Sequence, residues 1–170
     1  MNNLILYSAG VLPYSVSYDN TIYFLLGKDF ENKWSDFGGR CEASDNSDII
    51  VTASREYWEE SVGCISDLNY TKKILKKCKY IESKTTLGYP YYMFLLRIPH
   101  KEEYKYYFRS TRNFLEKINI DRKYKEKLDI RWFSSNNIID HKGFMVLKNN
   151  FSNTFINNYD AILKIIMESK

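Results

Sequence analysis

Residues 38–63 read GGRCEASDNSDIIVTASREYWEESVG, so that a double glycine and a polar loop precede an acid-rich amphipathic run. The run predicts a helix over Ser47–Ser61, with Ser47 as the N-cap and Asp48 favourably placed in the first turn. One arc of this helix is apolar and can anchor it in the core; its residues are Ile49, Ile50, Ala53 and Tyr57.

Three acids of the predicted helix are Glu56, Glu59 and Glu60. They fall within an arc of roughly 100° when each residue turns the helix by about 100°. Such a cluster attracts hard cations, although a solvated acidic face would show the same three residues. The preceding residues favour a cation site, because Gly38 and Gly39 allow backbone carbonyls to approach a ligand closely.

Arg55 stands immediately before the first acid, where its guanidinium can brace the loop through a loop carboxylate. With this residue the stretch resembles the Nudix box, which is a glycine, five residues, an acid, seven residues and then Arg-Glu-apolar-x-Glu-Glu-x-Gly-apolar. The leading glycine matches at Gly39, and the helical part matches at Arg55, Glu56, Tyr57, Glu59 and Glu60. The resemblance implies a loop–helix–loop metal site in an α/β/α sandwich with a mixed sheet.

Two departures from the box affect its loops. The loop acid that follows the glycine at the usual distance is Asp45, which leaves nine residues rather than seven before Arg55. Counted back from Arg55, the position of the loop acid holds Ser47. The loop is therefore two residues longer, and either Asp45 or Asp48 braces Arg55. One extra residue also precedes Gly63. Both changes spare the helix acids, so they affect loop geometry and substrate choice more than metal binding.

The whole chain, residues 1–170, is predicted to be a single α/β domain with a helical insertion around 101–127. Apolar and aromatic runs predict strands at Leu4–Val16, Thr21–Leu26, Lys72–Ile81, Pro90–Ile98 and Leu128–Phe133. The insertion should contain a helix around Glu102–Ile118, since a loop of that length is improbable in a compact domain. A closing helix is expected over Phe155–Glu168, with apolar spacing at Ile156, Tyr159, Ile162, Leu163 and Ile166.

Glu126 is a further site candidate, six residues before Trp132 in the run EKLDIRWF. This run resembles the acid–aromatic strand after the Nudix box, and several Nudix enzymes place an additional metal-binding or basic glutamate on the loop that enters it. A solvated loop glutamate is the alternative interpretation. Three other acids compete for the role: Glu102, Glu103 and Glu116.

Composition indicates an ordinary intracellular protein. Net charge is +4, and three widely spaced cysteines fit neither a disulfide framework nor paired zinc knuckles. No run has the basic flank of a signal peptide or the roughly 20 apolar residues of a membrane span, so we expect a cytoplasmic protein without membrane contact. Basic residues that could contact phosphate or RNA are Lys72, Lys73, Lys76, Lys77, Lys79, Arg109 and Arg112. The lysine run is equally consistent with the wet face of an edge strand.

The resemblance implies a metal-dependent hydrolase that cleaves a phosphoanhydride bond in a nucleoside-diphosphate-linked or related small substrate. Magnesium, or manganese in its place, would be held by Glu56, Glu59, Glu60 and the Gly39 carbonyl. Glu56 or Glu126 would take the proton of the attacking water. Alternatives are an mRNA cap hydrolase that contacts capped RNA, a diphosphoinositol polyphosphate hydrolase, and an inactive Nudix module that binds nucleotides or RNA. The sequence predicts no oligomeric state.

Overall fold

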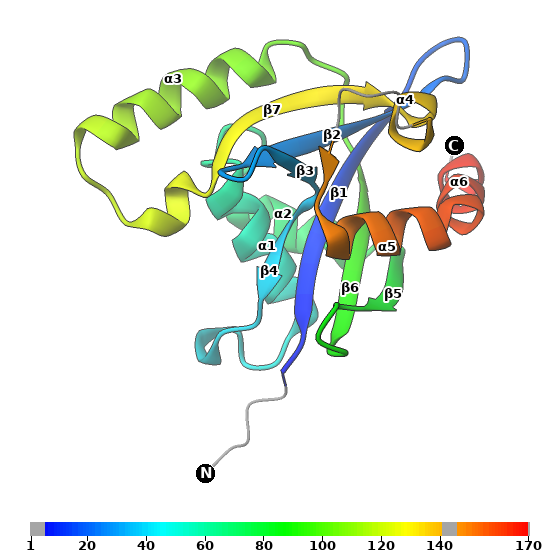
Figure 1. Ribbon diagram of the computed structural model, residues 1–170, viewed down its shortest axis with the longest axis horizontal. Helices are drawn as coiled ribbons and strands as arrows, with labels where there is room; N and C mark the ends of the chain where they lie inside the picture. The colour runs from blue at the N-terminus through cyan, green and yellow to red at the C-terminus, as the bar shows by residue number, and fades with distance from the viewer. Residues whose placement is uncertain (1–5, 141–145, 170) are drawn as a thin grey trace.

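The computed structural model describes residues 6–140 and 146–169 of the chain. Within them, eight strands form one mixed sheet in the order β5-β6-β1-β2-β3-β8, with β4 paired to β1 and β7 paired to β2. The strands are β1 (Ser8–Val16), β2 (Ile22–Asp29), β3 (Lys33–Ser35), β4 (Phe37–Arg40), β5 (Tyr80–Lys84), β6 (Pro90–Arg97), β7 (Lys127–Ser134) and β8 (Val146–Leu147). The α-helices are α1 (Ile49–Glu60), α2 (Leu68–Leu75), α3 (Tyr104–Lys117), α4 (Ser135–Ile139), α5 (Asn149–Asn157) and α6 (Tyr159–Glu168) (Figure 1). Two short 3-10 helices, η1 (Ala43–Asp45) and η2 (Arg122–Lys125), precede α1 and β7.

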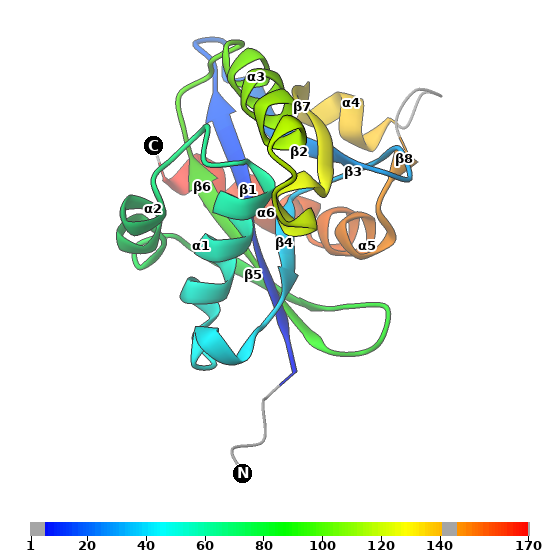
Figure 2. The ribbon, with the colours of Figure 1, turned by 90° about the vertical axis from the view of Figure 1, so that its left-hand side faces the viewer.

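Helices cover both faces of the sheet and bury two separate cores. Figure 2 shows α1 and α2 on one side of the sheet and α5 on the other. The core under α1, α2 and α3 includes Val11, Leu25, Phe37, Tyr57, Leu75, Phe94 and Phe108. The core under α4, α5 and α6 includes Leu12, Phe24, Leu26, Met93, Ile138, Phe151, Phe155 and Ile162. The alternation along β1 and β2 thus feeds both cores, and the architecture is the predicted α/β/α sandwich.

Two glycines set the close approach of β4 to the central strand. Gly10 on β1 lies opposite Gly38 on β4 in an antiparallel pair. A Cβ atom at Gly10 would lie 2.7 Å from the Phe37 carbonyl oxygen and 2.9 Å from the Tyr91 hydroxyl. Larger side chains here would push β4 away from β1, and β4 carries the glycine that begins the predicted metal loop.

The structure confirms four of the predicted strands as β1, β2, β6 and β7, although residues 4–5 of the first prediction lie outside the described residues. The prediction of a strand over Lys72–Ile81 is wrong at its start, because Lys72 belongs to α2 and β5 begins only at Tyr80. Helix α2 has its own N-cap, Asp67, whose side chain accepts hydrogen bonds from two backbone amides. The lysines at its end are therefore on a helix and not on the wet face of an edge strand.

Three helix predictions are also refined. The helix of the insertion is confirmed as α3, over Tyr104–Lys117. The predicted closing helix is two helices that meet at Asn158, and Ile156 of its apolar set is 42% exposed rather than buried. The N-cap of α1 is Asp48 and not Ser47, which has φ of 60° in the preceding turn. Within the described residues, no helix has the length and apolarity needed to cross a bilayer.

Replacing Phe155 with alanine tests the packing of α5 on the sheet. Phe155 is fully buried, and its ring meets the Phe24 ring edge-on with centroids 5.1 Å apart. We expect Phe155→Ala to lower the free energy of unfolding by about 3–5 kcal/mol in urea titrations. The matched control is its exposed neighbour, for which Ile156→Ala should cost less than about 1 kcal/mol. Equal losses for the two variants would contradict this packing.

Candidate active site

Helix α1 begins at a strong cap and is held against the sheet by its apolar arc. The Asp48 carboxylate accepts from the backbone amides of Ile50 and Val51 at 2.8 and 3.3 Å. Ala53 and Tyr57 are fully buried in the core below. This orientation fixes the remaining arc of the helix, with its three acids, at the edge of the core facing β4.

The backbone of β4 lies directly against two of these acids. A Cβ atom at Gly39 would lie 2.5 Å from Glu56 Oε2, so no other residue would leave the carboxylate where it is. The amide of Gly38 donates to Glu60 Oε2 at 2.8 Å. The double glycine therefore brings main-chain atoms of β4 against the acidic arc; the predicted approach of its carbonyls to a ligand stays a prediction.

Arg55 links the loop to the helix acids. Its Nε and Nη2 donate to the two carboxylate oxygens of Asp45 at 3.0 and 2.9 Å, and Nη2 also donates to the Arg40 carbonyl at 2.9 Å. Its Nη1 donates to Glu56 Oε1 at 2.8 Å and to Glu59 Oε2 at 3.3 Å. The predicted brace is confirmed with Asp45 as the partner, and Asp48 is excluded because its carboxylate caps α1.

Asp45 is almost fully buried and accepts three kinds of donor. Besides Arg55, its Oδ2 accepts from the Thr52 hydroxyl at 2.8 Å and from the Glu42 amide at 2.9 Å. Burial acts to raise the pKa of Asp45, but these hydrogen bonds outweigh burial and leave the pKa below its ordinary value. The longer loop is thus closed on a carboxylate that stays ionised.

Two lysines from the other side of the site contact the remaining acids. Lys123 Nζ, from η2, donates to Glu59 Oε1 at 2.8 Å, and its side chain is 39% exposed. Lys127 Nζ, at the start of β7, lies 3.4 Å from Glu60 Oε1, and its side chain is 1% exposed. All three helix acids are buried or half-buried and each faces a cation, although these cations differ in their access to solvent.

The charges of Glu56 and Glu60 are not fully compensated. Burial raises the pKa of Glu56 to about 7, with Arg55 acting to lower it and Glu59 and Glu126 reinforcing the rise. Burial also raises the pKa of Glu60 to about 8, against the opposing effect of Lys127. Additional positive charge beside either carboxylate would therefore stabilise its ionised form.

Glu126 lies close enough to act on this cluster. It is exposed at the end of η2, and it lines a surface depression of about 450 Å³ together with Glu60, Arg122 and Lys148. The three competing acids lie elsewhere: Glu102 is 3.3 Å from His100, Glu103 precedes α3, and Glu116 pairs with Arg112 at 2.9 Å. The structure thus brings Glu126, and none of its competitors, beside the helix acids.

The carboxylates of Glu56, Glu59 and Glu60 suit a hard divalent cation in type. The Glu56 carboxylate lies directly against the Gly39 backbone, within 2.6 Å of where a Cβ atom would stand. Across the described ranges 6–140 and 146–169, however, no three acidic, histidine or cysteine side chains already converge as a metal site. The arginine and the two lysines hold carboxylate oxygens instead, so a bound cation would have to displace some of these contacts.

Solved structures with the same arrangement of sheet and helices carry Nudix names. The Nudix hydrolase RenU from M. smegmatis aligns over 94% of this chain and 87% of its own, with a TM-score of 0.55 and 11% identity. The NUDIX domain of Shewanella oneidensis NrtR, complexed with ADP ribose, aligns over 98% and 89%, with a TM-score of 0.53 and 11% identity. The MutT protein from Methanosarcina mazei Go1 aligns over 95% and 97%, with a TM-score of 0.50 and 16% identity. The chain has the Nudix fold.

Sequence comparison adds no closer likeness, as no family model and no curated protein matches the chain. Two residues of this site were missed by sequence reasoning. They are Lys123 and Lys127, which lie more than 60 residues from the acids they contact. No local pattern marks them, because their roles arise from strand and helix pairing.

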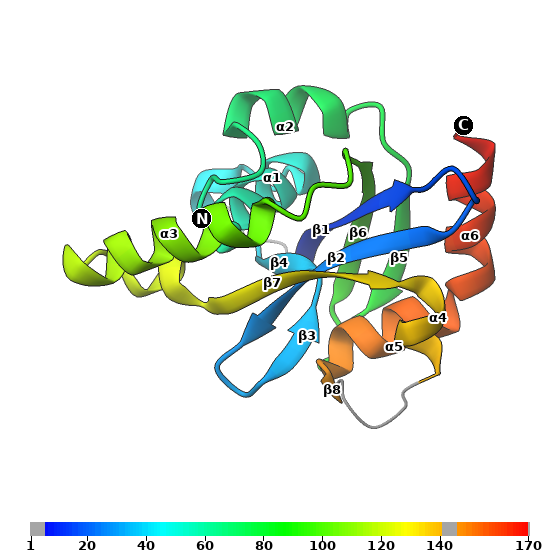
Figure 3. The same cartoon turned by 90° about the horizontal axis from the view of Figure 1, so that it is seen from above.

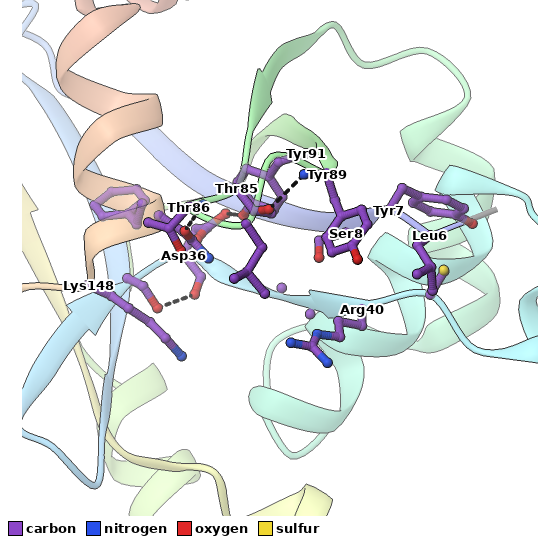
Figure 4. Close-up of a pocket in the computed structure, with 17 residues that line it drawn as sticks. Leu6, Tyr7, Ser8, Asp36, Arg40, Thr85, Thr86, Tyr89, Tyr91 and Lys148 are labelled. Carbon is purple, nitrogen blue, oxygen red and sulfur yellow. Dashed lines mark hydrogen bonds between the residues drawn. The ribbon is translucent and has the colours of Figure 1, made fainter. Parts of the chain in front are cut away.

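A pocket on the other side of β4 adjoins the carboxylate cluster. It has a volume of about 410 Å³ and is lined by β4, the β5–β6 hairpin, and the start of α5 (Figure 4). Asp36 is buried beneath it, accepts a hydrogen bond from the Tyr91 hydroxyl, and has its pKa raised by burial to about 6. Lys148 lines both this pocket and the depression beside Glu60. Lys148 thus lies between this pocket and the depression that Glu60 lines.

The tryptophans Trp34 and Trp58 both pack against other aromatic rings. Trp34 is 6% exposed and meets the Phe133 ring edge-on at 4.8 Å. Trp58 meets the Tyr124 ring edge-on at 5.8 Å, on the helix side away from the core. The aromatic residue at the mouth of the pocket is instead Tyr89, which is 41% exposed.

Breaking the Arg55–Asp45 contact should loosen the loop of this site. We expect Asp45→Asn to speed amide hydrogen exchange over residues 41–48 by about tenfold, because the neutral amide loses the paired charge that closes the loop. Asp48→Asn is the control, since asparagine caps a helix as well as aspartate does. Unchanged exchange in Asp45→Asn would show that Arg55 does not order the loop.

Proposed function

We propose that the chain is a Nudix hydrolase that uses magnesium, or manganese, to cleave a phosphoanhydride bond in a nucleotide-linked or related small phosphorylated substrate. The observation that carries the proposal is the placement of Glu56 and Glu60 against the Gly38–Gly39 backbone with raised pKa values. Buried carboxylates in this state favour a multivalent cation over further surface contacts. The Nudix fold of the chain and the spacing of its acids support the same chemistry.

In this proposal the metal ligands are the Gly39 carbonyl and the carboxylates of Glu56, Glu59 and Glu60. A bound divalent ion would supply charge neutralisation for the diphosphate and a lower pKa for the attacking water. Glu59 can turn toward the ion because its partner Lys123 is exposed and can swing away. Arg55 keeps Glu56 against Gly39 through its contacts to both sides of the loop.

The proton of the attacking water goes to a nearby carboxylate. We propose Glu126 for this role, since it is exposed, lies in the depression that Glu60 lines, and has no role in closing the loop. Glu56 is the alternative, with a pKa of about 7 that suits a base near neutral pH. A pH profile of turnover in Glu126→Gln separates the two, because only the loss of the true base removes the acidic limb.

The shape of the neighbouring pocket favours a small substrate. At about 410 Å³ it suits one nucleoside-sized group, and its rim holds Tyr89, Leu87 and Asn150. The NUDIX domain of NrtR, which has a similar fold, was crystallised in complex with ADP ribose. The lysines that could contact RNA lie on or just after α2, which packs on the outer side of α1 (Figure 3). Arg109 and Arg112 lie on α3, where they pair with Asp129 and Glu116. Capped RNA is therefore the second choice.

Product analysis across a panel of phosphorylated compounds tests the function. The panel should include nucleoside triphosphates, ADP-ribose, dinucleoside polyphosphates, a diphosphoinositol polyphosphate and capped RNA, each with and without magnesium. We expect magnesium-dependent release of two phosphorylated products from a small diphosphate. Binding of a nucleotide without turnover would identify the inactive binding module, and no binding would refute both.

Substitution of two helix acids tests the site itself. We expect Glu59→Gln and Glu60→Gln each to lower kcat by on the order of a hundredfold or more, because the amide keeps the shape but loses the charge that holds the cation. Glu82→Gln, at an exposed position of β5, is the control and should leave turnover unchanged. Near-normal turnover in either helix variant would remove the metal from this helix.

A further inference from the structure

Lys127 is a buried cation that the proposed chemistry does not use. Its Nζ donates to the Ser35 hydroxyl at 2.7 Å and to the Asp36 carbonyl at 3.1 Å, and it lies 3.4 Å from Glu60 Oε1. The side chain is 1% exposed, which is rare for lysine because burial of an ammonium ion is costly. Such a residue requires a compensating interaction.

The surrounding residues make a fitted channel for this side chain. A Cβ atom at Gly27 on β2 would lie 2.9 Å from Lys127 Cδ and 3.0 Å from Cε, so only glycine leaves room for the stem. The ammonium group lies 5.9 Å from the centroid of the Phe37 ring. Strands β2, β3 and β4 thus all contribute to holding one charge in place.

The charged partner of Lys127 at salt-bridge distance is Glu60. Its two hydrogen-bond acceptors, the Ser35 hydroxyl and the Asp36 carbonyl, are neutral oxygens. Glu60 in turn has one oxygen on the Gly38 amide and the other facing Lys127. Lys127 therefore supplies positive charge beside Glu60 when no other cation is present.

Lys127 differs in mobility from the other two cations of the cluster. Lys123 is 39% exposed and can release Glu59 into water, whereas Lys127 has no such route. Arg55 is 13% exposed and is fixed mainly on Asp45 in the loop. Of these three, Lys127 is the cation that faces a proposed metal ligand and is enclosed by the sheet.

We propose that Lys127 is a resident counter-ion of Glu60 that weakens the binding of a divalent cation at the carboxylate cluster. It is a positioning residue, since it acts on the metal site through Glu60. Because like charges repel, a fixed ammonium group a few Å away lowers the affinity of a divalent ion by roughly tenfold to a hundredfold. The cation is then bound firmly only when a diphosphate adds its own negative oxygens. This inference rests on the proposed metal site.

Direct measurement of Mn²⁺ binding by electron paramagnetic resonance, without substrate, tests the inference. We expect Lys127→Gln to bind Mn²⁺ at least about tenfold more tightly than the native protein. Lys127→Met is the second variant. Both variants should be purified with Mn²⁺, so that the cation compensates the Glu60 charge that has lost its lysine partner. Lys164→Met, an exposed position on α6, removes the same net charge far from the site and should leave the affinity unchanged.

The outcomes separate this inference from the proposed function. Tighter binding in both Lys127 variants supports the counter-ion role, and so does a variant that folds only with Mn²⁺. Equal or weaker binding in the Lys127 variants, with measurable binding in the native protein, overturns the role of Lys127 but leaves the metal site intact. Absence of Mn²⁺ binding in every protein overturns the metal site itself. A matching gain in Lys164→Met would assign the effect to net charge and overturn the inference.

Discussion

The constraint on which the site depends is the burial of like charges on one helix face. Tyr57 and Ala53 pull α1 into the core, and this places Glu56, Glu59 and Glu60 at the edge of the sheet. Water is largely removed from these carboxylates, while their mutual repulsion remains. The other groups of the site stabilise the carboxylates in this buried position.

Those groups come from three directions. Strand β4 supplies the Gly38 amide, and it can approach because Gly10 and Gly38 face each other. Arg55 supplies a charge from the helix itself and, through Asp45, closes the lengthened loop. Lysines come from η2 and β7, on the far side of the cluster. The negative charges of Glu56 and Glu60 are still incompletely compensated. A divalent cation would compensate the remainder.

The parts of the molecule that the sequence predicted are those with local causes. The acidic arc, the core arc and the Arg55 brace follow from helical periodicity and from residues close together in the chain. The alternation of lysine and apolar residues after Lys72 is compatible with a strand, and only the cap at Asp67 indicates the helix that forms. Lys123, Lys127 and the pocket residue Asp36 depend on which strands become neighbours. Such pairing involves residues distant in sequence, so inspection of one segment cannot reveal it.

The most direct measurement is the free energy of unfolding of the metal-free protein at about pH 5 and about pH 8, repeated with magnesium. Burial raises the pKa values of Glu56 and Glu60 from 4.5 to about 7 and about 8, so between these limits the folded state binds more protons than the unfolded state. The metal-free protein should therefore lose stability as pH rises from about 5 to 8, by a few kcal/mol, about as expected for two such shifts after allowance for structural relaxation. Magnesium should restore most of that loss at about pH 8, and Glu60→Gln should flatten the pH dependence. Equal stability at the two pH values, or no effect of magnesium at the higher one, would contradict the view that these buried carboxylates await a cation.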